Sequence, residues 1–286
     1  MEIILVPKIG FCFGVKRAVD ISVETFKKKP RPCQVLGPLV HNEFVIEELR
    51  RKGIKFINSL GKAKSGTVII PAHGEDPKVL EKIKKIGLGL VDATCPLVTK
   101  VQNLAKIINN KGRQVIIIGD RNHKEVKSIQ ATISGKGIII SDAKEIPRLK
   151  IKGKSVGVLT QTTQNPEKVK NILKKLKNKF RDLKFYNTLC PTVQSYQTEV
   201  KKLAPKVDLI LIVGSKNSAN TKRLVEIAKE KQKQAHHIEN ARELKKEWLL
   251  GIKKVGVAGG TSTPGWLIKE VIKKIAKNDN NKKTKN

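Results

Sequence analysis

Short apolar runs alternate along the chain with polar segments of helical period. The apolar runs are four or five residues long, as expected of strands buried on both faces, and include residues 3–6, 67–70, 115–118, 156–159 and 209–213. The polar segments, rich in Lys and Glu, include residues 103–110, 167–179 and 221–232. This alternation predicts an α/β protein with parallel sheets, which bind ligands at the carboxyl ends of their strands. We expect a disordered tail over residues 278–286, which are rich in Lys and Asn.

A repeat becomes visible when the turns after the predicted strands are compared. In three places a strand is followed by Gly and, four residues later, by a polar residue that precedes a helix: His41, His123 and Ser218. After the next strand comes a second polar position, occupied by His73, Thr162 and Ser262. In the first two repeats a further strand then leads to a cysteine, Cys95 and Cys190. Internal repeats of this kind indicate modules with the same fold.

The third repeat ends without its strand and cysteine, and both are present at the N-terminus as residues 3–6 and Cys12. Read as a circle, the chain therefore predicts three similar α/β modules in a pseudo-threefold cloverleaf. The modules would span residues 13–95, 96–190 and 191–277, the last completed by the strand within residues 1–12. Chance similarity among strand–Gly–helix turns, which are common, is the alternative.

Three cysteines in equivalent positions, Cys12, Cys95 and Cys190, predict a metal centre. Thiolates spaced by whole modules favour an iron–sulfur cluster over a structural zinc, which usually takes closely paired cysteines. A single reactive cysteine with a histidine as base is the alternative. Cys33 falls outside the pattern.

The polar repeat positions lie where phosphate groups are commonly bound, at strand ends and helix starts. For any one Ser or Thr, helix capping is an equally ordinary role. A carboxylate follows each marked histidine by two residues, as Glu43, Glu75 and Glu125. One of them could deliver protons near a metal centre, or each could simply stabilise the first turn of a helix. Spacing does not choose among the three.

The charge balance is strongly basic, with 59 Lys and Arg against 25 Asp and Glu in 286 residues, a formal net charge of +34. An RNA- or ribosome-associated protein is one interpretation. Aromatic residues make up only 4% of the chain, too few for base-stacking platforms, and no nucleic-acid-binding motif is present. Solvated helix faces explain the lysines better, and we expect no nucleic-acid partner. No apolar stretch reaches the ~20 residues of a membrane span, and we expect a cytoplasmic protein.

Five segments together resemble one known family: GFCFGVKRAV at 10–19, GPLVHN at 37–42, AHG at 72–74, DATCP at 92–96 and GSKNS at 214–218. The family is that of the 4-hydroxy-3-methylbut-2-enyl diphosphate reductases (the LytB family), and the resemblance extends over the chain up to the tail. It implies a cloverleaf around an oxygen-sensitive 4Fe–4S cluster held by Cys12, Cys95 and Cys190, with one iron open to substrate.

The resemblance also implies roles for the polar positions. It assigns diphosphate binding to His41, His73, His123, Ser218, Asn220 and Ser262, with the backbone of Ala219 between Ser218 and Asn220. Thr162 would lie near the substrate hydroxyl, and Glu125 would relay protons. The implied reaction is a two-electron, two-proton reductive dehydroxylation of an allylic diphosphate to isopentenyl and dimethylallyl diphosphate. It is the last step of the methylerythritol phosphate route, and ferredoxin or flavodoxin is the expected electron donor.

Three positions depart from the family pattern. Lys124 stands where Pro is common, Ala219 where Ser or Gly is common, and Val193 where Thr is frequent. The functional side chains named above are retained, so these departures bear on turnover rate and local loop geometry more than on identity. A degenerate member that keeps the cluster without the activity is a further alternative.

Overall fold

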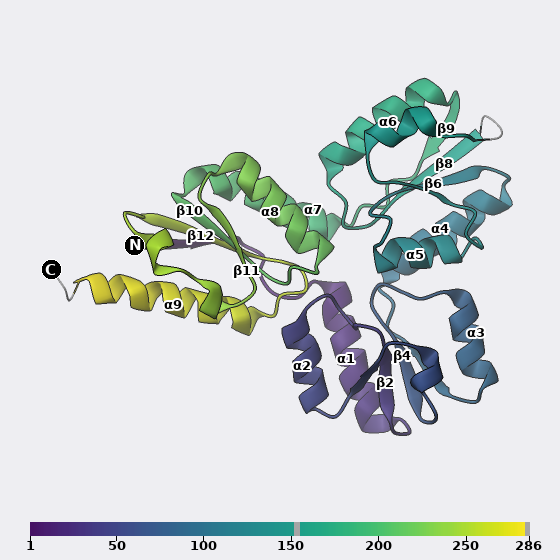
Figure 1. Ribbon diagram of the computed structural model, residues 1–286, viewed down its shortest axis with the longest axis horizontal. Helices are drawn as coiled ribbons and strands as arrows, with labels where there is room; N and C mark the ends of the chain where they lie inside the picture. The colour runs from purple at the N-terminus through teal and green to yellow at the C-terminus, as the bar shows by residue number, and fades with distance from the viewer. Residues whose placement is uncertain (152–154, 284–286) are drawn as a thin grey trace. The chain divides into compact units, whose positions relative to one another are not determined.

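The computed structural model describes residues 1–151 and 155–283, with the backbone alone for 280–283. The chain forms two compact units. Unit 1 comprises Met1–Phe13, His41–Val45 and the chain from Pro191 onward, and unit 2 comprises Gly14–Val40 and Ile46–Cys190. Figure 1 labels most of their helices and strands.

Unit 2 contains two parallel four-stranded sheets. The first has the order β3-β2-β4-β5 and consists of Cys33–Leu36 (β2), Lys55–Ile57 (β3), Thr67–Ile70 (β4) and Gly89–Asp92 (β5). The helices of this part of the chain are Phe13–Lys28 (α1), Glu43–Arg51 (α2) and Pro77–Lys85 (α3).

The second sheet of unit 2 has the order β7-β6-β8-β9. Its strands are Gln114–Ile118 (β6), Ile138–Ile140 (β7), Ser155–Thr160 (β8) and Asp182–Phe185 (β9). Its helices are Pro96–Asn110 (α4), Lys124–Ala131 (α5) and Pro166–Lys179 (α6). Because side chains alternate along a strand, Ile116 and Ile118 pack with the buried face of α6, whereas Val115 and Ile117 pack with α4 and α5.

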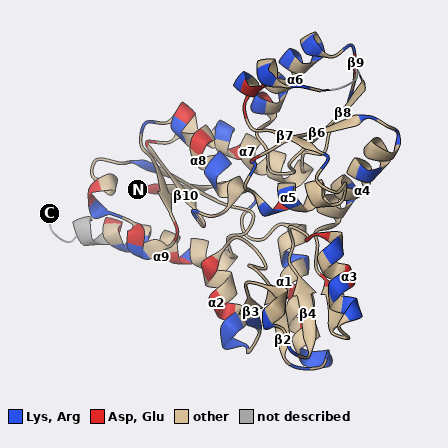
Figure 2. Ribbon diagram, turned by 45° about the vertical axis from the view of Figure 1, so that its right-hand side comes forward, with Lys and Arg blue, Asp and Glu red and all other residues tan. Residues whose placement is uncertain are grey.

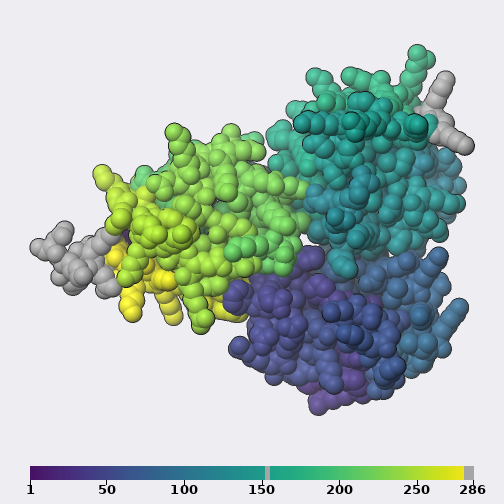
Figure 3. All heavy atoms as spheres, in the orientation of Figure 1, coloured from purple at the N-terminus to yellow at the C-terminus, as the bar shows by residue number. Residues whose placement is uncertain are grey.

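Unit 1 has one parallel sheet in the order β1-β12-β10-β11. Its strands are Glu2–Leu5 (β1), Leu209–Val213 (β10), Ala235–Ile238 (β11) and Lys254–Gly259 (β12), and its helices are Pro191–Leu203 (α7), Ala219–Lys231 (α8) and Gly265–Lys283 (α9). Ile210 and Ile212 pack with α7 and α8, and Leu209 and Leu211 with α9. The space-filling view draws the residues of unit 1 from Pro191 onward in green to yellow (Figure 3).

The three sheets share one strand order. In each, the first strand of the module pairs with the second on one side and the third on the other, and the fourth pairs with the third. In unit 1 the fourth strand is β1, paired with β12 from Glu2↔Lys254 to Leu5↔Val257. This is the position that the circular repeat assigns to the N-terminal strand. The prediction of three similar α/β modules is confirmed, whereas the boundaries 13–95, 96–190 and 191–277 with 1–12 stay a prediction.

Two boundaries differ from the sequence-based expectation. Helix α4 begins at Pro96 rather than near residue 103, because the fixed φ of proline suits the first position of a helix. Helix α9 continues to Lys283, so residues 278–283, expected to be disordered, are helical. The N-terminal ammonium of Met1 lies 2.8 Å from the carboxylate of Asp279 and stabilises this last part of α9. Residues 284–286 lie outside the described residues.

Lysine and arginine positions are distributed over the helices of both units (Figure 2). Many form exposed pairs one helical turn apart, such as Lys16–Asp20 and Lys28–Glu24, both at 2.6 Å. These pairs agree with the interpretation of the lysines as solvated helix faces. Among the described residues, no helix is both long and apolar enough to cross a membrane.

Candidate active site

The three repeat cysteines occupy the same position in their modules. Each follows a fourth strand and directly precedes a helix: Cys12 before α1, Cys95 before α4 and Cys190 before α7. Each backbone N–H donates to a carbonyl in the turn after the third strand, namely from Cys12 to Thr261 at 3.0 Å, from Cys95 to Ala72 at 2.9 Å and from Cys190 to Thr162 at 2.9 Å. The turns therefore place the three thiols equivalently within their own modules.

These same turns correct one detail of the repeat. Each contains a hydrogen bond between residues three apart, from Gly74 to Pro71, from Gln164 to Gln161 and from Thr263 to Gly260. In this register the residue that matches His73 and Ser262 is Thr163, and Thr162 matches Ala72 and Thr261. Because Thr162 and Thr163 are adjacent and identical, the sequence does not show which of them matches His73. The end of β8 at Thr160 shows that it is Thr163.

Glu125 and Thr162 form a buried pair in unit 2. Glu125 is 4% exposed and lies in the first turn of α5. Its carboxylate accepts hydrogen bonds from the backbone N–H of Thr162 at 2.6 Å and from the Thr162 hydroxyl at 2.8 Å. Burial raises the pKa of Glu125, the two hydrogen bonds from Thr162 lower it, and the negative charge of Asp120 raises it; the net result is a pKa of about 7. A carboxyl group with such a pKa exchanges a proton readily near neutral pH.

His123 caps the helix that carries Glu125. The backbone N–H of Glu125 donates to Nδ1 of His123 at 3.2 Å, so Nδ1 is unprotonated and Nε2 bears the hydrogen of the neutral ring. The neutral side chain can therefore donate to an anion through Nε2. The hydroxyl of Ser128 donates to the backbone carbonyls of Glu125 at 2.8 Å and of His73 at 2.9 Å, which ties the two turns together.

His73 has the opposite tautomer. Its Nδ1 lies 2.9 Å from the carbonyl oxygen of Gly74, which can only accept, so Nδ1 carries the hydrogen. Nε2 then donates to an anion only when the ring is protonated. His73 also lines a cavity of about 190 Å³ together with Glu75 and Lys124. The lysine at position 124, unusual in the family pattern, thus adds a positive charge beside this histidine.

In unit 1 the polar positions hold neutral side chains around one histidine. The hydroxyl of Ser262 donates to the backbone carbonyl of His41 at 3.3 Å. Ser218 caps α8, and its Oγ accepts from the N–H of Thr221 at 3.3 Å. Ala219 and Asn220 follow in the first turn, where backbone N–H groups have no acceptor within the helix. This turn can offer several donors to an anion.

Asn220 is the unusual member of this turn. It is 2% exposed, and within the described part of the chain neither its Oδ1 nor its Nδ2 has a hydrogen-bond partner. The same holds for the hydroxyl of Thr221, which lies so near Gly260 and Gly214 that a Cβ at either glycine would collide with it. Buried polar groups without partners are costly, and they fit a site that a polar ligand completes.

The sequence interpretation missed two of these polar side chains, Thr221 and Gln197. Gln197 is buried on α7, and both of its amide atoms also have no partner among the described residues. No sequence signal could find either residue, because polar residues within a helix ordinarily face solvent.

The thiol of Cys95 is closely packed in unit 2. A Cβ added to Gly14 would lie 2.6 Å from its Sγ, so only glycine allows this approach. Burial raises the pKa of Cys95, as do the charges of Cys190 and Glu125, while N–H groups of Leu97 and Val98 lower it. Cys95, Cys190 and Glu125 therefore lie within electrostatic reach of one another.

The other two cysteines complete the picture. Cys12 lies in unit 1, half-buried like Cys95 and Cys190. Cys33 is buried with its thiol directed at the carbonyls of Thr25 and Pro30. Among the described residues, no group of three or more His, Cys, Asp or Glu side chains could hold a single metal ion.

Comparison with known proteins decides the family. The LytB protein family model matches residues 3–276. The chain belongs to this family. This chain is 41% identical over 283 residues to the 4-hydroxy-3-methylbut-2-enyl diphosphate reductase of Geobacter sulfurreducens, covering 99% of this chain and 100% of the relative. It is 39% identical to the enzyme of the same name from Aquifex aeolicus, covering 96% of each.

Solved structures agree with this assignment. The E-1-hydroxy-2-methyl-but-2-enyl-4-diphosphate reductase from Plasmodium falciparum superposes with a TM-score of 0.91 at 30% identity, covering 95% of this chain and 87% of that one. A second structure, of an (E)-4-hydroxy-3-methyl-but-2-enyl diphosphate reductase described as the terminal enzyme of the non-mevalonate pathway, has a TM-score of 0.71 at 39% identity over 97% of this chain. The resemblance stated from the sequence is confirmed.

Proposed function

We propose that this chain is a 4-hydroxy-3-methylbut-2-enyl diphosphate reductase that releases isopentenyl and dimethylallyl diphosphate. The reaction consumes two electrons and two protons, breaks the allylic carbon–oxygen bond and releases the hydroxyl oxygen as water. The observation that carries the proposal is the buried Glu125–Thr162 pair beside Cys95 and Cys190. It joins a proton donor of pKa about 7 to two thiols in one unit.

Cys12, Cys95 and Cys190 would hold a 4Fe–4S cluster. Two observations support the fit: the three cysteines have equivalent turn positions, and Gly14 leaves the Cys95 sulfur the space that a Cβ would fill. Thiolates are the usual ligands of such clusters, and a cluster with three of them would supply electrons and keep one iron open to the substrate.

The diphosphate would be bound by the polar positions to which the family pattern assigns this role. Unit 2 offers His123 as a neutral donor and His73 as a protonated one. Unit 1 offers His41, Ser218, Ser262, the Asn220 amide and the first-turn N–H of Ala219. The unpartnered amide of Asn220 supports this assignment, because a bound phosphate oxygen would satisfy its Nδ2.

The proton would move through Glu125 and Thr162. Oε2 of Glu125 lies 2.8 Å from Oγ1 of Thr162, so a protonated carboxyl can pass its proton to the hydroxyl. The hydroxyl in turn can pass its own proton to the departing oxygen of the substrate. With a pKa of about 7, Glu125 is protonated often enough to act and ionises easily enough to be recharged. Ferredoxin or flavodoxin as donor and a cytoplasmic location stay predictions.

The experiment that tests the proposal is purification without oxygen, followed by iron and sulfide analysis and a turnover assay. We expect about four irons and four sulfides per chain. Reduced methyl viologen should then convert the allylic diphosphate to both products. Colourless protein that stays free of iron after reconstitution would refute the proposal, and a loaded but inactive protein would identify a degenerate member.

Gly14→Ala offers a sharper test of the metal site. The new Cβ would contact Cys95 at 2.6 Å, so we expect a clear loss of bound iron. Gly61→Ala is the matched control, because no atom lies within 4 Å of its added Cβ. Equal iron content in the two variants would remove Cys95 from the ligand set.

A further inference from the structure

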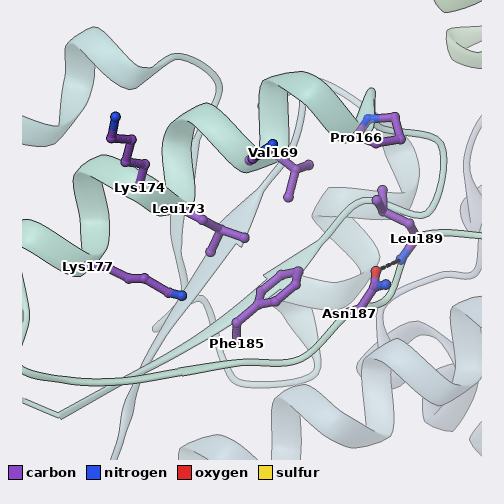
Figure 4. A pocket seen from close by; sticks show the side chains of 9 residues that line it. Pro166, Val169, Leu173, Lys174, Lys177, Phe185, Asn187 and Leu189 are labelled. Atoms are coloured by element: carbon purple, nitrogen blue, oxygen red, sulfur yellow. Dashed lines mark hydrogen bonds between the residues drawn. The ribbon is translucent and has the colours of Figure 1, made fainter.

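A groove of about 420 Å³ lies between α6 and β9 in unit 2. Its floor is apolar: Val169 and Leu173 of α6 point toward Phe185 of β9, and Leu189 closes one end (Figure 4). Phe185, Leu173 and Leu189 are half-buried. The floor thus offers an apolar surface of the kind found at the centre of protein interfaces.

The rim of the groove is basic. Lys170, Lys174 and Lys177 line it and follow one another along one side of α6, at spacings of four and three residues. No Asp or Glu lines the groove. Within the described ranges, none of these three ammonium groups is part of an ion pair. Among the charged positions of α6, basic ones outnumber acidic ones, as the blue and red segments of Figure 2 show.

The lysines of α1 provide the contrast. Lys16 pairs with Asp20 and Lys28 with Glu24, each at 2.6 Å on an exposed face. A lysine in such a pair has its charge largely neutralised. The rim of the groove therefore carries three positive charges that are available to a negatively charged partner.

The groove also ends beside a proposed cluster ligand. Leu189 lines it, and the next residue is Cys190. Neighbouring Cα atoms are ~3.8 Å apart, so a protein seated on the floor would lie close to the thiol that the proposed function assigns to the cluster.

We infer that this groove docks a small acidic electron-transfer protein, with the apolar floor contacting its centre and the lysines contacting an acidic rim. The inference rests on the proposed function, which needs two electrons for each product. Each docking event would oxidise the partner by one electron, so two are needed per turnover. A second copy of this chain fits poorly, because it would bring lysines against lysines in a protein of net charge +34.

The test compares two triple variants with the same change in charge. The groove variant is Lys170→Glu, Lys174→Glu, Lys177→Glu. The control is Lys82→Glu, Lys84→Glu, Lys85→Glu, at exposed positions of α3 that are absent from the groove. The probe is an acidic plant-type ferredoxin, used in reduced form for turnover and titrated directly for binding. Reduced methyl viologen serves as the donor that needs no docking.

We expect the groove variant to raise the Kd and the KM for ferredoxin about tenfold or more and to flatten their dependence on salt. The control should stay within about threefold of the wild type, and turnover with methyl viologen should be the same in all three proteins. Equal effects of the two triple variants, or no effect of either, would overturn the inference. Failure of the wild type to turn over with methyl viologen would refute the proposed function instead, while the binding titration would still decide the groove.

Discussion

The first turns of α5 and α8 have the same backbone position in their modules but opposite chemistry. Each helix begins directly after a capping residue, His123 or Ser218, and the second residue of each helix, Glu125 or Asn220, is a buried polar residue. Glu125 is ionisable, and its carboxylate accepts hydrogen bonds from Thr162 in the turn after β8. Asn220 is neutral, and neither of its amide atoms has a partner within the described part of the chain. The repeat thus gives both helices the same backbone arrangement at their first turns. In unit 2 this turn carries an ionisable group, Glu125, and in unit 1 it carries an amide, Asn220, that a ligand could still bind.

The corresponding position of the first module sharpens this comparison. Glu43 stands two residues after His41, as Glu125 does after His123, but it is exposed. Here Asn42 caps the helix, accepting from the N–H groups of Phe44 and Val45. The helix therefore starts one residue later relative to the marked histidine, and the glutamate turns to solvent. Burial, rather than the spacing of the sequence, distinguishes the three glutamates.

The largest expected effect comes from replacing the acid at this position. Glu125→Gln keeps the shape of the side chain but removes the transferable proton, so turnover should fall ~100-fold or more. Iron content should stay unchanged, since Glu125 is not a proposed ligand. Glu43→Gln, in the matching exposed position, is the control and should retain wild-type turnover. Turnover of the Glu125 variant above a tenth of the wild-type value would refute the relay.

The same pair predicts how stability depends on pH. The pKa of Glu125 is raised from 4.5 to about 7 by folding, so the folded protein binds this proton more tightly than the unfolded chain. The resulting stability is fully present below pH 4.5 and is lost as the pH rises through about 7. The loss from this group is about 3 kcal/mol of unfolding free energy.

Denaturant titrations of wild type and Glu125→Gln at several pH values measure this loss. The variant does not ionise, so the difference in unfolding free energy between the two proteins should move in favour of the variant between pH 5 and 8. A difference that is independent of pH would show that Glu125 titrates at its ordinary pKa.

The strand order of the three modules could be predicted from the sequence, whereas the hydrogen-bond partners of the buried polar side chains could not. The apolar runs and the turn residues repeat with the strand order, so the three sheets and the completing role of β1 follow from pattern alone. The pairing of Glu125 with Thr162, rather than Thr163, depends on where β8 ends. The burial of the Asn220 and Gln197 amides without hydrogen-bond partners results from packing between helices, which leaves no periodic pattern in the sequence. The helical continuation of α9 is accompanied by an ion pair between Met1 and Asp279, 278 residues apart in the sequence, which no local pattern could predict.

The next test gives the first turn of α8 a carboxylate like that of α5. Asn220→Asp gives unit 1 the kind of charge that unit 2 carries, at a position expected to face phosphate. Repulsion between like charges should raise the KM for the allylic diphosphate about thirtyfold, ~2 kcal/mol. Asn220→Ala should also weaken binding, yet leave the unfolding free energy unchanged or higher, because it removes two buried polar atoms without partners. A loss of stability in the alanine variant would mean that these atoms are satisfied in the free protein.

The smallest effect is expected one residue earlier, at Ala219. Its side chain is buried, and the family commonly has a serine or glycine there, so binding would depend on its backbone N–H in the first turn of α8. Ala219→Ser adds one hydroxyl to a turn in which Ser218 and Asn220 already supply donors. One additional neutral hydrogen bond contributes about 1 kcal/mol at most, partly offset by burying the hydroxyl, so KM should change by less than about threefold. A change of tenfold or more in KM would mean that the side chain at position 219, and not the backbone, governs how this turn binds the diphosphate. Residue 219, rather than Asn220, would then be the functional counterpart of Glu125 in α5.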